Sequence, residues 1–194
     1  YGYKASAVPG TVAGLLETHK RYGKLPLRRI LQPVISQAEK GIYVSYDFNQ
    51  AIDSAVQLTL DIESRNTYHK NNAPLKEHMI LYRTNLAWTL KEIAKDGQEA
   101  FYKGTIAKKI IKAMQQNGGY ISSQDLTNYQ PRFSQPIQTT YRDHKVLAHP
   151  PPAGGATVLL EGLNIIENFE TNKMGPNSAS FIHLFAEALQ RGHM

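Results

Sequence analysis

The sequence of 194 residues contains no cysteine. This absence excludes disulfide bonds, a catalytic thiolate, and zinc or iron–sulfur centres that depend on cysteine ligands. It leaves the compartment open, because periplasmic proteins often lack cysteine as well. Long apolar runs are absent too: the best one, residues 154–166, is interrupted by Glu161 and Asn164. A membrane-spanning helix needs about 20 apolar residues, so none is predicted.

Motifs for metal, phosphate and nucleotide binding are also missing. No two of the seven histidines lie three or four positions apart, and no Gly-Xaa-Ser-Xaa-Gly hydrolase motif occurs. We therefore predict no metal site and no cofactor. The pair Gly154-Gly155 follows three prolines and precedes a helical segment, where backbone amides could bind an anion. It lacks the Lys-Ser/Thr of a P-loop, so we favour a packing role in which helix and strand approach closely.

The composition is that of a folded protein. Apolar residues make up 41% and charged residues 20%, which excludes intrinsic disorder as the main state. The net charge of +6 is a mild excess that is compatible with an anionic partner without requiring one. Tyr1 in place of Met, with no signal peptide after it, indicates a piece of a longer protein. We expect residues 1–194 to form a single partial domain.

Helical periodicity dominates and predicts a mainly α fold with a small β-hairpin. The hairpin is expected at about residues 137–148, around a tight turn at residues 142–144. Thr11 and Thr105 are predicted to cap the helices that follow them, and Pro33 to kink or split its helix. Residues 63–72 are predicted to be a loop. Helices are expected at about residues 11–22, 26–41, 45–60, 84–94, 98–102, 105–116, 122–129, 156–169 and 178–194.

Residues 105–129 have the outline of a helix-turn-helix, which makes a helical nucleic-acid-binding module the alternative function. The lysines at 108, 109 and 112 would then face phosphates. The second helix, however, contains Asp125 and no Lys or Arg that could contact phosphates or guanines. A solvated face of an amphipathic helix explains the three lysines more simply.

A series of short motifs resembles the γ-glutamyltranspeptidase family. The series starts at Ala7-Val8-Pro9-Gly10-Thr11-Val12-Ala13-Gly14 and runs in the family's order along almost the whole chain. After the triple proline this chain reads Ala153-Gly154-Gly155-Ala156, where many members read Ser-Ser-Gly-Gly. The further matching blocks are Tyr22-Gly23, Gln32-Pro33, Asn85-Leu86-Ala87, Phe101-Tyr102-Lys103-Gly104, Asn117-Gly118-Gly119, Asp125-Leu126, Tyr141-Arg142 and Pro150-Pro151-Pro152.

The resemblance implies an αββα N-terminal nucleophile hydrolase, made as a zymogen that cuts itself before a threonine. That threonine, at the start of a small subunit, would attack a γ-glutamyl amide such as glutathione and pass the acyl group to water or an amino acid. The chain would be the helical part of the large subunit, with the small subunit and the remaining large-subunit segments as partners. A periplasmic or secreted bacterial location is implied as well. No catalytic or substrate-binding residue of the family is carried onto this chain.

Overall fold

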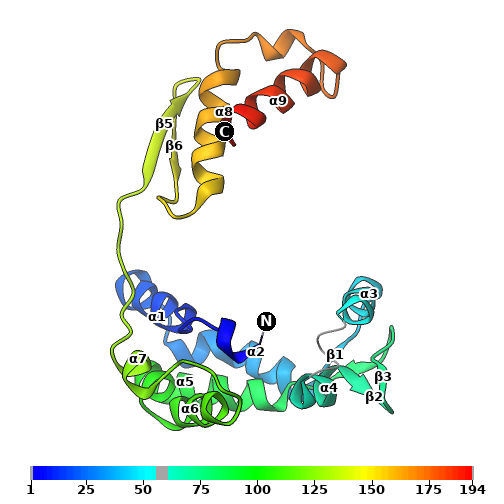
Figure 1. Cartoon of the computed structure of the whole chain (residues 1–194), viewed down its shortest axis with the longest axis vertical. Coiled ribbons are helices and arrows are strands. Elements are labelled where there is room, and N and C mark those ends of the chain that lie inside the picture. The colour runs from blue at the N-terminus through cyan, green and yellow to red at the C-terminus, as the bar shows by residue number, and fades with distance from the viewer. Residues whose placement is uncertain (1, 56–60, 194) are drawn as a thin grey trace. The chain divides into compact units, whose positions relative to one another are not determined.

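The computed structural model describes residues 2–55 and 61–193. The fold is mainly α-helical with a hairpin, as predicted, and it also has two minor strand pairs that were not predicted (Figure 1). Its contacts gather into two compact units, unit 1 (Tyr1–Pro131) and unit 2 (Arg132–Met194). The single partial domain expected over residues 1–194 stays a prediction, because two compact units can belong to one larger domain.

Unit 1 is a helical body in which α5 packs against α1, α2 and α6. The strand pairs are antiparallel, with β1 beside β4 and β2 beside β3. Its elements are a 3-10 turn (Tyr3–Ala5), α1 (Thr11–Tyr22), α2 (Leu27–Lys40), β1 (Ile42–Tyr43), α3 (Tyr46–Ser54), α4 (Ile62–Tyr68), β2 (His69–Lys70), β3 (Ala73–Pro74), β4 (Ile80–Leu81), α5 (Thr84–Tyr102), α6 (Thr105–Gln116) and α7 (Ser123–Thr127).

Helix α5 is broken at Gly97, whose φ of 60° and ψ of −134° are not helical. The prediction of separate helical segments before and after this glycine is confirmed. A residue with a β-carbon would be strained at this positive φ, so glycine is needed there. Ile93 before the break and Ala100 after it share one buried cluster with Ile106 of α6. Both segments of α5 therefore contribute to the same core.

The predicted loop at residues 63–72 is wrong, because much of this segment is ordered into α4 and β2. Asp61 caps α4 by accepting a hydrogen bond from the Ser64 amide at 2.7 Å. Asn71 and Asn72 then adopt positive φ and turn the chain from β2 into β3. The predicted helix over residues 45–60 is observed as α3, capped by Ser45. Its last part, residues 56–60, lies outside the described residues.

Pro33 does not split α2, so of the two predicted outcomes only a kink stays a prediction. Proline lacks an N–H and leaves the carbonyl of Arg29 without its helical partner. Packing against α5 offsets this cost: Ile35 and Ala38 of α2 are buried in a cluster with Ala87 of α5. Tertiary contacts therefore support one continuous helix across Pro33.

Unit 2 contains the predicted hairpin at residues 137–148 and two long helices. Ile137 pairs with Ala148 at the open end, and Tyr141 pairs with His144 at the turn. Arg142 and Asp143 both have positive φ, as a two-residue type I′ turn requires, so His144 belongs to the strand. The elements of unit 2 are β5 (Ile137–Tyr141), β6 (His144–Ala148), α8 (Gly154–Ile166), a 3-10 turn (Thr171–Lys173) and α9 (Ala179–Gly192).

Helix α8 packs against the hairpin and against α9 (Figure 1). The Thr139 hydroxyl of β5 donates a hydrogen bond to the Asn164 side-chain oxygen of α8 at 2.7 Å. The close-packing role predicted for Gly154 and Gly155 is wrong, because a β-carbon at either residue would meet no atom within 4 Å. α8 begins at this glycine pair, earlier than predicted. It ends at Ile166, before the predicted end near residue 169.

The apolar residues of α8 and α9 are only partly covered within unit 2. Leu160 and Ala188 are buried, whereas Leu159, Ile182 and Phe185 are about half exposed. Exposed apolar side chains at this density are normally covered by further protein. None of the described helices, even so, has both the length and the apolarity that a membrane crossing needs.

Candidate functional site

Four of the sequence motifs meet in one buried cluster of unit 1, which we call the motif junction. It joins the start of α1, the end of α5, α6 and α7. Its buried members are Ala13, Tyr102, Ala107, Met114, Ile121 and Leu126. Ala13, Tyr102 and Leu126 belong to the segments 7–14, 101–104 and 125–126. Ala107, Met114 and Ile121 lie within three positions of the segments 101–104 and 117–119. Motifs that are separate in the sequence therefore form a single structural unit.

The hydroxyl of Tyr102 links the two ends of the motif junction. It accepts a hydrogen bond from the Ala13 amide at 3.1 Å and donates one to the Pro9 carbonyl at 2.7 Å. Ala13 is in the first turn of α1, where amides have no partner within the helix. Tyr102 therefore supplies the cap of α1 from another helix. Burial raises the pKa of this phenol, with a smaller opposing effect from the Ala13 amide.

The predicted cap of α1 by Thr11 is wrong, since the N-cap is Gly10 and no side chain bonds to it. A β-carbon at Gly10 would lie 2.0 Å from the Tyr129 hydroxyl oxygen, so a capping side chain does not fit. The ring of Tyr129 stacks on Tyr102 with 5.6 Å between centroids and 8° between planes. Tyr129 therefore leaves no room for a capping side chain at Gly10, and its stacking partner Tyr102 bonds the first turn of α1 instead.

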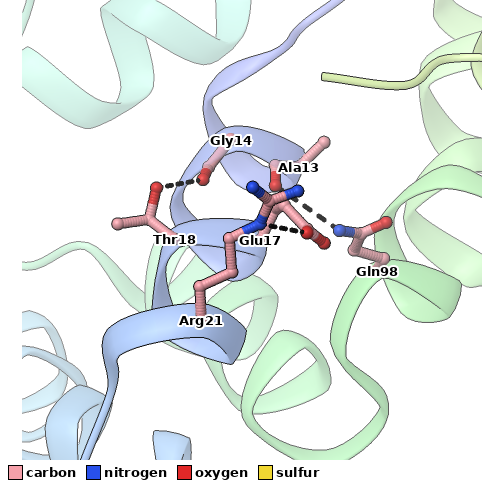
Figure 2. Close-up of polar contacts among 6 residues, drawn as sticks. All are labelled: Ala13, Gly14, Glu17, Thr18, Arg21 and Gln98. Atoms are coloured by element: carbon pink, nitrogen blue, oxygen red, sulfur yellow. Dashed lines mark hydrogen bonds and ion pairs between the residues drawn. The ribbon is translucent and has the colours of Figure 1, made fainter. Parts of the chain in front are cut away.

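A second polar contact fixes α1 on α5, as Figure 2 shows. The Gln98 amide, next to the break in α5, donates a hydrogen bond to the Ala13 carbonyl at 3.4 Å. On the same helix Thr18 donates to the Gly14 carbonyl, and Arg21 forms an ion pair with Glu17 at 2.9 Å (Figure 2). Ala13 is therefore held at both its amide and its carbonyl by α5.

A close backbone approach joins α5 to α6 at Gly104. The predicted cap by Thr105 is wrong, because Gly104 is the N-cap and no side-chain bond is made. A β-carbon on Gly104 would lie 2.9 Å from the Ala100 carbonyl oxygen, which is backbone and cannot rotate away. Any residue can adopt the φ of −85° found at Gly104. Glycine is therefore required here because there is no space for a side chain, and not because of the backbone conformation.

Helix α7 is held by a capping box rather than shaped for reading a nucleic acid. The Ser122 hydroxyl accepts from the Asp125 amide, while Asp125 accepts from the Ser122 amide at 2.8 Å and from its hydroxyl. These hydrogen bonds lower the pKa of the Asp125 carboxyl. With five residues and an acidic side chain at its start, α7 offers nothing that favours the helix-turn-helix alternative.

Several polar groups at the motif junction, those of Tyr102, Gln98 and Asp125, take part in hydrogen bonds that hold its helices. Within residues 2–55 and 61–193 no group of three or more His, Asp or Glu side chains is arranged to bind a metal. The family block at 141–142 is structural as well: the Arg142 amide donates to Glu167, and its guanidinium contacts Thr171. Sequence reasoning missed Tyr102, Gln98 and Tyr129. The useful signal would have been that a buried tyrosine hydroxyl needs a partner.

Comparisons with known proteins agree on one family. The γ-glutamyltranspeptidase family model matches residues 1–193. The glutathione hydrolase proenzyme of Escherichia coli K12 is 39% identical over 187 residues, which cover 95% of this chain and 32% of that protein. The acylase ACY 1 proenzyme of Pseudomonas sp. V22 is 37% identical and is covered to 34%, with 97% of this chain aligned. The chain thus spans about a third of the length of these relatives.

The fold gives the same result. The crystal structure of the Helicobacter pylori γ-glutamyltranspeptidase matches with a TM-score of 0.93 and 32% identity, covering 99% of this chain and 56% of that one. A cephalosporin acylase from Bacillus halodurans matches with a TM-score of 0.90 and 30% identity, covering all of this chain and 37% of that one. With its sequence motifs, its fold and almost its full length matched, the chain belongs to the γ-glutamyltranspeptidase family.

Proposed function

We propose that the protein containing this chain is a γ-glutamyltransferase and glutathione hydrolase. It would cleave γ-glutamyl amides with an N-terminal threonine nucleophile, which its precursor releases by cutting itself. The observation that carries this proposal is the family match over residues 1–193. The relatives that bear the names glutathione hydrolase and proenzyme support it.

We infer that this chain acts as scaffold and contains none of the catalytic residues. In the motif junction the hydroxyl of Tyr102 is engaged by Pro9 and Ala13, and the carboxylate of Asp125 is engaged by Ser122. A nucleophile or a general base needs a group that is free to meet the substrate. These two groups already have hydrogen-bond partners within the chain, which supports a structural role.

The proposed partners are the small subunit and the other large-subunit segments of the same precursor. The half-exposed apolar residues Leu159, Ile182 and Phe185 of α8 and α9 support this, since further protein would cover them. A periplasmic or secreted location is proposed from the family resemblance. The bacterial glutathione hydrolase relatives support a bacterial origin.

Two measurements test the proposal. The purified chain, incubated with a γ-glutamyl anilide, should release no amine above background, and turnover by a clean sample would contradict the scaffold role. In a chimera, this chain replaces the matching segment of the Escherichia coli glutathione hydrolase proenzyme. We expect the chimera to cut itself into two subunits and to hydrolyse the anilide. A folded chimera that matures without hydrolysing any γ-glutamyl amide would overturn the proposed activity.

A further inference from the structure

A groove of about 450 Å³ lies on unit 1, bounded by the end of α5, one face of α6 and the short helix α7. Tyr102, Ala107 and Ile111 line it with apolar surface. Lys103, Lys108 and Lys112 line it with positive charge. We call it the α6–α7 groove. Its volume is within the range of about 300–1,000 Å³ that small-molecule sites occupy.

The charge in the α6–α7 groove is of one sign. No Asp or Glu is among the residues that line it. Lys103 is paired with Glu99 at 2.9 Å, but Lys108 and Lys112 have no ion pair with any residue of the described chain. These two lysines lie at positions i and i+4 of α6, a spacing at which like charges repel and destabilise a helix. An anion between the two ammonium groups would relieve that repulsion.

The apolar part of the groove is built on rigid core residues. Tyr102 and Ala107 are buried members of the motif junction, and Ile111 packs against it. The hydroxyl of Tyr102 is already bonded to Pro9 and Ala13, so only the ring of this residue can contact a ligand in the groove. Ser123 and Thr127 of α7 add hydroxyl donors. The groove therefore combines an apolar lining, two unpaired cations and neutral donors.

We propose that the α6–α7 groove binds a small amphiphilic carboxylate, a molecule with a medium-length aliphatic chain and one carboxylate. The chain lies on Tyr102, Ala107 and Ile111, and the carboxylate lies between Lys108 and Lys112. Charge complementarity requires an anion, and the apolar lining requires a hydrocarbon body, so neither inorganic anions nor neutral alcohols satisfy both. The proposal rests on residues of this chain alone and does not depend on the proposed γ-glutamyl chemistry.

The test is a titration of the full chain with octanoate, butanoate and 1-octanol, followed by NMR of labelled alanine and isoleucine methyl groups. We expect saturable shifts of Ala107 and Ile111 with octanoate. Butanoate should bind more weakly by about two- to four-fold per methylene removed, the upper value being that of full burial. Octanol should bind more weakly than octanoate by about ten-fold, because two exposed charge contacts are each worth at most about five-fold.

Matched variants separate the groove from general charge effects. Lys108→Gln/Lys112→Gln should weaken octanoate binding by about ten-fold and leave octanol binding unchanged. Lys20→Gln/Lys24→Gln removes the same charge from exposed lysines outside the groove and should leave octanoate binding within two-fold of the original. The proposal is overturned if octanol binds as tightly as octanoate, if both double variants behave alike, or if Ala107 and Ile111 do not shift.

Discussion

Replacing Tyr102 by phenylalanine tests whether a tyrosine from α5 caps α1. The substitution keeps the ring and its stacking on Tyr129 but removes the hydroxyl between Pro9 and Ala13. Pro9 is exposed, so water can reach its carbonyl, whereas Ala13 is 0% exposed and its amide stays unpaired. An unpaired buried amide costs about 1–3 kcal/mol, and losing an N-cap costs about 0.5–2 kcal/mol. Both values describe the same bond, so we expect a loss of about 2 kcal/mol.

Urea unfolding of the full chain measures this loss through the fluorescence of its single tryptophan, Trp88, which is in α5 of unit 1. With a slope of about 2 kcal/mol/M, Tyr102→Phe should lower the midpoint by about 1 M. Tyr120→Phe is the matched control, because Tyr120 is 74% exposed and no hydrogen bond of its hydroxyl is observed. The capping role is refuted if the two variants unfold at the same urea concentration.

Three further predictions concern the same region. Gly10→Ala should destabilise unit 1 by about 1–3 kcal/mol in urea unfolding, because its β-carbon meets the Tyr129 hydroxyl, and adding Tyr129→Phe should restore part of the loss. Because burial raises the pKa of Tyr102, the fold favours the neutral phenol, so stability should fall as the pH rises above about 10. Tyr102→Phe should lack that part of the fall. The pKa of Asp125 is lowered by Ser122, so the stability that Asp125 contributes should be lost as the pH falls below about 4, and acid unfolding of Asp125→Asn should show a shallower slope. An unchanged slope would contradict the capping box.

Elements with a strong local pattern could be predicted from the sequence. α6 begins and ends at the predicted residues 105 and 116, because one apolar face and two glycine-containing boundaries define it. The hairpin at residues 137–148 was predicted for the same reason, since β-branched residues flank a short polar turn. Ser45 and Ser178 cap their helices, as serine at such boundaries usually does.

Elements that depend on distant partners could not be predicted. The strands β1 and β4 have two residues each, too few to show an alternating pattern, and Ile42 pairs with Leu81 far along the chain. The caps at Gly10 and Gly104 were missed because threonine follows each glycine and is the better capping residue in isolation. Whether a side chain fits is decided by Tyr129 in the first case and by the Ala100 backbone in the second.

The candidate site was the least predictable part. Periodicity identifies Tyr102 as an apolar helix residue and carries no information on its hydroxyl. The partners of that hydroxyl, Ala13 and Pro9, are 89 and 93 positions away. The family resemblance identified the segments that matter, but only the folded chain shows that they meet.

The capping of α1 by Tyr102 also orders the events of folding. Contacts between α5 and α6 are local in sequence and close quickly, whereas the Tyr102–Ala13 bond must close a loop of nearly ninety residues. We therefore expect the N-terminal turn of α1 to become fully satisfied after the α5–α6 pair has formed. A bond that forms after the transition state affects only unfolding, so Tyr102→Phe should speed unfolding and leave the refolding rate almost unchanged.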